Sequence, residues 1–219
     1  MKLKLFLLLF LVVSATQLKA QTGFPFDNEV REFKHADSLN MPKPGGILFI
    51  GSSSIRLWSD LEQRFVGKPI IKRGLGGSQL WQWVKYYTPY VVYPYQPEKI
   101  FLYAGENDIA DGRSGKQVAE DFENFWKLVS TKLPHTEFYF LAIKPSPSRA
   151  KFFSEVNTAN SLIKESIKGK RRTHFIDVAS VILDEKTGQP DSSLFKQDML
   201  HLNTKGYDKW QRVIEKYIK

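Results

Sequence analysis

Short apolar runs that alternate with amphipathic segments constrain the fold of this chain more than any other feature. The first run, Ile-Leu-Phe-Ile at 47–50, is continuously apolar and stops at Gly51. This pattern is typical of a strand that is buried on both faces. Four further candidate strands follow it: residues 69–71, 99–104, 138–143 and 174–178.

Helical patterns lie between the candidate strands. Behind Ser114, a residue type that caps helices, apolar residues recur at three- and four-residue spacing up to Pro134. Similar patterns predict helices that open at Ser154 and near Thr204, and a leading helix within 24–39 that packs on the outside. The alternation predicts an α/β fold, a three-layer α/β/α sandwich around a parallel five-stranded sheet.

The first twenty residues differ from the rest of the chain. Lys2 and Lys4 precede a short apolar run, and Ala20 stands before Gln21, as in a cleaved secretory signal peptide. A membrane anchor is the alternative, but the run is shorter than the roughly 18 to 20 residues that a spanning helix needs. We therefore predict a signal peptide at 1–20, a single domain at 21–219, export to the periplasm or the extracellular space, and no integral membrane span.

Composition excludes several classes of function. The chain of 219 residues has no cysteine, so disulfides, thiolate metal sites and cysteine nucleophiles are absent. The formal net charge is +9, and the only basic cluster, residues 168–172, contains no aromatic residue. We interpret this cluster as a solvated helix end, and we predict no nucleic-acid partner.

Distinctive polar residues follow three of the candidate strands. They are Gly51-Ser52-Ser53, the glycine-rich stretch at 74–77, and Gly105-Glu106-Asn107-Asp108. Ligands bind outside the carboxyl ends of strands in an open parallel sheet. Each group alone has an ordinary alternative as a turn or a helix cap, and 74–77 lacks the third glycine of a dinucleotide-binding loop.

A fourth group, Asp198-Met199-Leu200-His201, lies near the C-terminus. A carboxylate three residues before a histidine can bind its Nδ1, which selects the tautomer and stabilises the imidazolium formed in proton transfer. Neither His135 nor His174 has an acidic neighbour placed in this way. The alternative is a histidine with a purely structural hydrogen bond.

Together the four groups, in this order over residues 45–217, resemble the SGNH (GDSL-type) hydrolase family of serine esterases. The resemblance implies a flavodoxin-like fold with Ser53 as nucleophile and His201 as base. It implies that Asp198 completes a catalytic triad. It also implies an oxyanion hole made of the Ser53 and Gly77 N–H groups and the Asn107 side chain, with no metal and no cofactor.

Two positions depart from the family pattern. Ser52 stands where an aspartate outside the triad is usual, and Glu106 stands where a small polar residue is common. Ser53 is chosen over Ser52 and Ser54 because it is the second residue after Gly51, as in the family block.

The predicted substrate is a short-chain ester. The segments 105–115 and 144–154, which should border the site, are short and polar, and a shallow cleft gains little from burying a long acyl chain. Trp81 and Trp83 are candidate platforms for a sugar ring, or else part of a helix's core face. We expect acetyl esters of small molecules or saccharides as substrates. A lysophospholipase-type lipid esterase and a non-catalytic binding module with the same fold are the alternatives.

Overall fold

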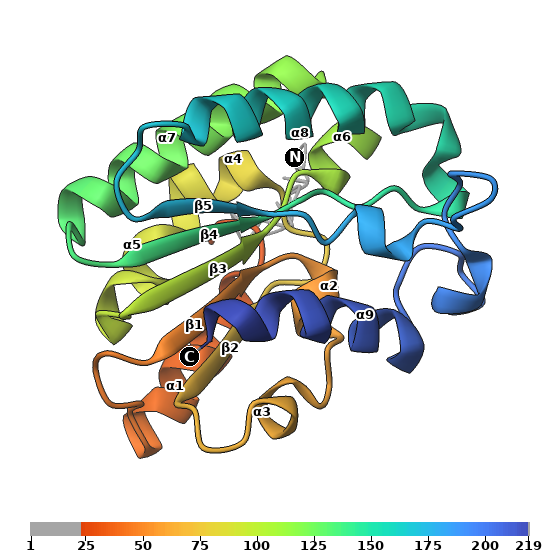
Figure 1. The fold of residues 1–219 in the computed structure, drawn as a ribbon. Coiled ribbons are helices and arrows are strands. Elements are labelled where there is room, and N and C mark those ends of the chain that lie inside the picture. Colours follow the sequence, from red (N-terminus) through yellow and green to blue (C-terminus); the bar gives the residue numbers. More distant parts are fainter. Residues whose placement is uncertain (1–22, 219) are drawn as a thin grey trace, which may run out of the picture.

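The computed structural model describes residues 23–218, and its centre is a sheet of five parallel strands (Figure 1). The strands are β1 (Ile47–Gly51), β2 (Ile70–Gly74), β3 (Lys99–Tyr103), β4 (Glu137–Leu141) and β5 (Thr173–Ile176). Their order is β2-β1-β3-β4-β5, and all four pairings are parallel. This is the flavodoxin-like order, so the predicted fold class is confirmed. The predicted signal peptide lies outside the described residues.

Helices cover both faces of the sheet, which gives three layers (Figure 1). Leu48 and Ile50 of β1 pack in one core, together with α1 (Asp27–Leu39), α7 (Gly115–Lys132) and α8 (Phe153–Ile167). Ile47 and Phe49 pack in the other core, with α2 (Ser53–Arg56), α3 (Leu61–Arg64) and α9 (Thr204–Ile214). Because alternate residues of a strand face opposite layers, a strand with two covered faces must be apolar throughout.

The helix caps agree with the sequence pattern. The Ser114 hydroxyl accepts from the N–H of Gln117, whose side chain accepts from the N–H of Ser114, a reciprocal capping box. Helix α8 begins one residue before the predicted Ser154. It is preceded by a 3-10 segment, Pro147–Phe152, which the sequence did not predict.

The connection between β2 and β3 is broken into short pieces. It contains α4 (Leu80–Gln82), a π-helical turn (Trp83–Tyr87), α5 (Thr88–Val91) and a 3-10 turn (Tyr93–Tyr95). The Thr88 hydroxyl donates to the carbonyl of Trp83 at 2.6 Å. Pro89 has no N–H with which to continue an α-helical hydrogen-bond pattern. The wider π-helical turn accommodates Pro89 and the hydrogen bond of the Thr88 side chain.

The remaining elements are short: α6 (Glu106–Ala110) and 3-10 turns at Ser180–Ile182, Ser192–Leu194 and Glu215–Tyr217. Within residues 23–218, none of the helices combines the length and the apolarity needed to cross a membrane.

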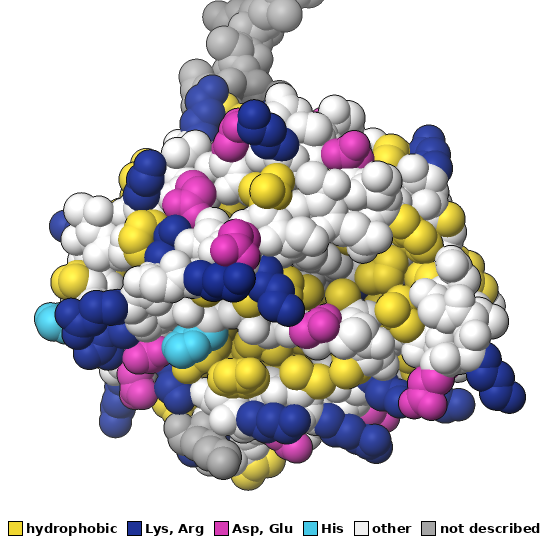
Figure 2. All heavy atoms as spheres, turned by 45° about the horizontal axis from the view of Figure 1, so that its top comes forward, with side chains coloured by type: hydrophobic (Ala, Val, Ile, Leu, Met, Phe, Trp, Pro, Cys, Tyr) yellow, Lys and Arg dark blue, Asp and Glu magenta, His cyan; other side chains and the backbone are white. Residues whose placement is uncertain are grey.

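The basic cluster at 168–172 is ion-paired with acidic side chains. Lys168 lies 2.5 Å from Glu165, Lys170 lies 3.1 Å from Glu123, and Arg172 lies 3.3 Å from Glu137. Figure 2 shows basic and acidic side chains interspersed over the face that it presents. The cluster is therefore part of a mixed charged surface.

Candidate active site

The first strand ends in a sharp turn that presents Ser53. Gly51 has φ 129°, and a Cβ there would lie 1.8 Å from the carbonyl oxygen of Tyr103, so only glycine fits. Ser52 follows in an extended conformation, and its N–H donates to the same Tyr103 oxygen at 2.9 Å. Ser53 then becomes the first residue of α2, where its N–H has no partner within the helix.

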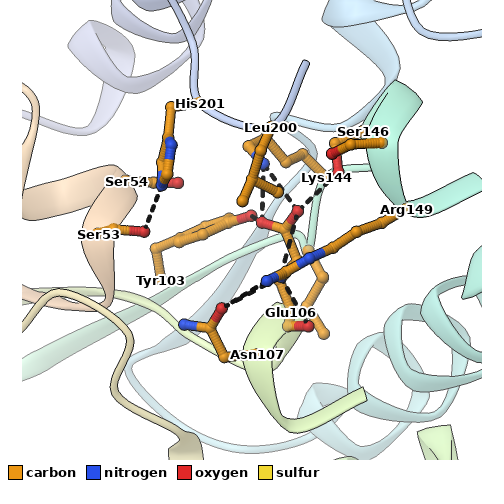
Figure 3. A network of polar contacts seen from close by, with 12 residues as sticks. Ser53, Ser54, Tyr103, Glu106, Asn107, Lys144, Ser146, Arg149, Leu200 and His201 are labelled. Carbon is orange, nitrogen blue, oxygen red and sulfur yellow. Dashed lines mark hydrogen bonds and ion pairs between the residues drawn. The ribbon is translucent and has the colours of Figure 1, made fainter. Parts of the chain in front are cut away.

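A series of hydrogen bonds joins Ser53, His201 and Asp198. The Nε2 atom of His201 lies 2.9 Å from the Ser53 hydroxyl oxygen, and its Nδ1 lies 2.7 Å from Oδ2 of Asp198. Figure 3 shows the imidazole facing Ser53. An ionised carboxylate only accepts, so Nδ1 carries the proton and Nε2 is left to accept one from the hydroxyl.

The turn that carries Asp198 holds its carboxylate in place. Oδ1 of Asp198 accepts from the backbone N–H groups of Leu200 and His201, both at 2.9 Å. Partial desolvation raises the pKa of Asp198, but the hydrogen bonds from the His201 ring and from these two N–H groups outweigh it. The pKa therefore lies well below its usual range, and the carboxylate is ionised at neutral pH.

Gly77 and Asn107 lie on neighbouring loops of the same sheet edge. Gly77 is exposed, has φ 90°, and its N–H donates to no group in the described part of the chain. Nδ2 of Asn107, in the first turn of α6, donates to the carbonyl of Ser78 at 3.1 Å. The Ser78 hydroxyl in turn donates to the Gly51 carbonyl at 3.3 Å. The glycine loop is thus tied to both neighbouring strand ends.

A buried ionic network, which the sequence did not predict, lies beside these residues. Glu106, 6% exposed, accepts from the ammonium of Lys144, 1% exposed, at 2.9 and 2.7 Å. It also accepts from the hydroxyls of Tyr103 at 2.7 Å and Ser146 at 2.9 Å. Burial raises the pKa of Glu106, but the charge and hydrogen bonds of Lys144 outweigh burial and hold it below its ordinary value.

A signal for this network was present in the sequence. Lys144 directly follows one apolar run, and Glu106 follows another after a single glycine, Gly105. The carboxyl ends of adjacent parallel strands meet at one edge, so charges in these positions can pair.

A second buried carboxylate links α6 to the connection after β2. Both oxygens of Asp108, 0% exposed, lie 2.9 Å from the N–H of Leu80. Burial raises the pKa of Asp108 to about 6. This contact helps to keep the loops of Gly77 and Asn107 together.

The two tryptophans that were predicted to bind substrate have different environments. Trp83 is 0% exposed and its indole N–H donates to the Ser78 hydroxyl at 3.0 Å. The prediction for Trp83 is therefore wrong, because its ring is part of the core. Trp81 is half-buried and its ring lies edge-on to Tyr86, 6.1 Å between centroids.

An aromatic residue near the N-terminus, which the sequence did not single out, lies close to Gly77. A Cβ on Gly77 would be 3.6 Å from the tip of the Phe26 ring. Phe26 is half-buried and has a left-handed backbone with φ 59°, an uncommon conformation for a bulky side chain. The segment before α1 therefore contributes one wall beside the glycine loop.

A serine, a histidine and a carboxylate in one hydrogen-bonded series at the carboxyl edge of a parallel sheet define the class of serine hydrolases. Residues 51–209 match the GDSL-like Lipase/Acylhydrolase family, and the chain belongs to this family. It is a serine ester hydrolase.

Solved structures share the fold. A candidate platelet activating factor from Streptococcus pneumonia has a TM-score of 0.77 at 24% identity, covering 88% of this chain and 92% of that one. A GDSL-like lipase from Bacteroides thetaiotaomicron has a TM-score of 0.71 at 16% identity, with 86% and 96% covered. A catalytic mutant of an acetylxylan esterase from Geobacillus stearothermophilus has a TM-score of 0.64 at 12% identity, covering 81% of this chain and 96% of that one. No curated protein matches the sequence of this chain.

Proposed function

We propose that the protein is an exported esterase that hydrolyses short-chain acyl esters, chiefly acetyl esters, of small molecules or saccharides. The observation that carries the proposal is the hydrogen-bonded series from Ser53 through His201 to Asp198. Gly77 and Asn107 lie at the same sheet edge.

The geometry supports a two-step acyl transfer. The Ser53 oxygen attacks the ester carbonyl carbon while Nε2 of His201 takes the hydroxyl proton. The imidazolium, stabilised by Asp198, gives this proton to the departing alcohol, and an acyl-serine forms. Water then attacks the acyl-serine, with His201 again taking and returning the proton, and the carboxylic acid leaves.

The tetrahedral intermediate of each step carries a negative oxygen that needs aimed donors. We assign this role to the N–H groups of Ser53 and Gly77 and to Nδ2 of Asn107. Among residues 23–218 the N–H of Gly77 has no acceptor, and glycine has no Cβ, so a substrate can approach this N–H closely. Removal of one such donor typically lowers turnover about 100- to 1000-fold.

The short-acyl and saccharide parts of the proposal rest on the rim of the site. The segment after β4 is a compact 3-10 turn, and the segment after β3 is the short helix α6. Half-buried Phe26 offers aromatic surface beside Gly77, and half-buried Trp81 follows the glycine loop in the chain. Among proteins with this fold are an acetylxylan esterase and an acetyl esterase solved with acetate ion.

Release of acetate from p-nitrophenyl acetate and from acetylated xylo-oligosaccharides tests the proposal. We expect turnover of both, with no turnover by Ser53→Ala. Turnover of lysophospholipids in preference to both would favour the lipid-esterase alternative. Binding of an ester without any turnover would favour a non-catalytic module.

Export is tested separately. The segment at 1–20 predicts that the mature protein begins at Gln21. N-terminal sequencing of the protein recovered outside the cytoplasm should give this residue first. Recovery of an uncleaved N-terminus in the cytoplasm would contradict it.

A further inference from the structure

Arg149 lies beside Asn107 and contacts it with two nitrogen atoms. Nη1 and Nη2 of Arg149 are each 3.1 Å from Oδ1 of Asn107, and Nη1 also donates to the backbone carbonyl of Glu106 at 3.1 Å. Figure 3 shows the guanidinium extending across to the Asn107 amide. The Arg149 side chain is 22% exposed, so most of it is buried in the protein.

The partners of Asn107 determine which end of its amide faces each neighbour. A guanidinium only donates, so the atom that faces Arg149 must be Oδ1. The carbonyl of Ser78 only accepts, so the atom 3.1 Å from it must be Nδ2. Nδ2 has two hydrogens, and Ser78 takes one of them. The other is available to a substrate oxygen.

We propose that Arg149 is a positioning residue of the oxyanion hole, which holds Oδ1 of Asn107 and thereby aims Nδ2 at the negative oxygen of the tetrahedral intermediate. The inference rests on the proposed function, in which Asn107 donates to that oxygen. Hydrogen bonds from a charged donor are roughly twice as strong as neutral ones. A cation at Oδ1 also polarises the amide, which makes Nδ2–H a stronger donor.

The segment that carries Arg149 is anchored on both sides of the site. The Arg149 N–H donates to the Ser146 carbonyl at 2.9 Å, and the Ser146 hydroxyl donates to buried Glu106. On the other side, both the N–H and the hydroxyl of Ser148 donate to the Met199 carbonyl at 3.0 Å. Met199 lies between Asp198 and His201, so one short turn connects the base to the oxyanion hole.

The Glu106–Lys144 pair explains why Arg149 points toward Asn107. Nη1 of Arg149 lies 3.8 Å from Oε1 of Glu106, within range of its charge. Lys144 and two hydroxyls already bind both oxygens of this carboxylate. The guanidinium is therefore attracted to Glu106 electrostatically while its N–H groups are directed to the Asn107 amide.

A purely structural Arg149 and a positioning Arg149 predict different kinetics. Loss of a structural tie would loosen the segment and change KM together with stability. Loss of a positioning contact weakens an interaction that is stronger in the transition state than with bound ester, so kcat falls while KM changes little.

The first test compares single variants on p-nitrophenyl acetate. We expect Arg149→Met to lower kcat about 10- to 100-fold, less than removal of a whole donor, with KM within about threefold of wild type. Arg149→Lys should recover part of kcat because an ammonium can still donate to Oδ1. Arg172→Met is the control, since Arg172 pairs with Glu137 at the opposite end of the sheet. An unchanged kcat in Arg149→Met would overturn the inference.

The second test is a double-mutant cycle with Asn107→Ala. If Arg149 acts through Asn107, then adding Arg149→Met to Asn107→Ala should lower kcat no further. An equal loss in both backgrounds would show an independent role and overturn the inference. Full kcat in Asn107→Ala would instead refute the proposed role of Asn107 itself. Thermal melting of each variant identifies any that fails to fold, and the Lys variant then carries the comparison.

Discussion

Three side chains from two distant segments carry the proposed chemistry. Asp198 and His201 belong to one tight turn, where Asp198 accepts from the backbone as well as from the ring. Ser53 lies 148 positions away along the chain and meets His201 only through the fold. The turn thus prepares the base locally, and the strand–turn–helix at Gly51 brings the nucleophile to it.

Ser53→Ala should abolish ester hydrolysis while leaving the fold intact, because in residues 23–218 the Ser53 hydroxyl is the one that contacts Nε2 of His201. The readout is turnover of p-nitrophenyl acetate alongside the thermal melting curve. Ser52→Ala and Ser54→Ala are matched controls, since both serines are buried next to the proposed nucleophile. Loss of turnover in Ser54→Ala but not in Ser53→Ala would show that the nucleophile is misassigned.

Hydrolysis should be faster at the alkaline end of the range from pH 5 to 9 than at the acid end, because a protonated imidazole cannot act as a base. Only a neutral His201 can accept the Ser53 proton. The pKa of Asp198 lies well below its usual range, so Asp198 stays ionised throughout this range and adds no second limb. The measurement is kcat/KM from pH 5 to 9, and a flat profile would exclude a histidine base.

At the scale of elements, short helices and loops at one edge of the sheet are held by buried charged groups. Glu106 and Asp108, both in the first turn of α6, point in different directions and bind different partners. Glu106 reaches Lys144 after β4, and Asp108 reaches the N–H of Leu80 at the start of α4. Helix α6 therefore connects the loops that follow three strands, with Asn107 between its two anchors.

The stability of the Asp108→Asn variant, relative to that of the wild type, should increase as pH rises from about 4 to 7. Burial raises the pKa of Asp108 to about 6, so the folded protein binds its proton more tightly than the unfolded chain does. The wild-type protein therefore loses stability as Asp108 ionises. A shift from 3.8 to about 6, at about 1.4 kcal/mol per pKa unit, corresponds to a loss of about 3 kcal/mol. Asn keeps an acceptor for Leu80 without ionising.

The measurement for Asp108→Asn is the difference in Tm between variant and wild type across this pH range. A constant offset that reflects the altered hydrogen bonding is expected at every pH. The prediction concerns the slope, and a difference that does not change with pH would contradict it.

At the scale of the whole molecule, the series of Ser53, His201 and Asp198 lies at one edge of the sheet. Helices close both faces of the sheet (Figure 1), so substrate reaches Ser53 at the carboxyl ends of the strands. The neighbouring walls are the 3-10 segment Pro147–Phe152, the loop of Gly77 and Phe26. These walls are short connections, which favours a shallow site.

Acetyl and butyryl esters should be hydrolysed with higher kcat/KM than octanoyl or longer esters. Each buried CH₂ contributes about 0.8 kcal/mol, and a shallow site buries few of them. A series of p-nitrophenyl esters from C2 to C12 measures this dependence. A maximum at C8 to C12 would contradict the short-acyl proposal and support a lysophospholipase-type substrate.

The sequence alone determined the strands, most long helices and the polar groups at the strand ends. These features depend on neighbours within a few residues: apolar runs for buried strands, three- and four-residue spacing for α7, and the Asp198–His201 turn. The fold class could be predicted because alternation of strands and helices leaves few ways to cover a sheet.

Only the tertiary structure decided the contacts between distant segments. Lys144 meets Glu106 across 38 positions and Arg149 meets Asn107 across 42, and both contacts exist because β3 and β4 are adjacent. The exposure of an aromatic was equally undetermined, since helical spacing does not show which face of a segment the core will cover. Trp83 lies in the core and Phe26 forms a wall of the site. Their exposures depend on how the connection after β2 packs against α1 and the sheet, and local sequence does not determine that packing.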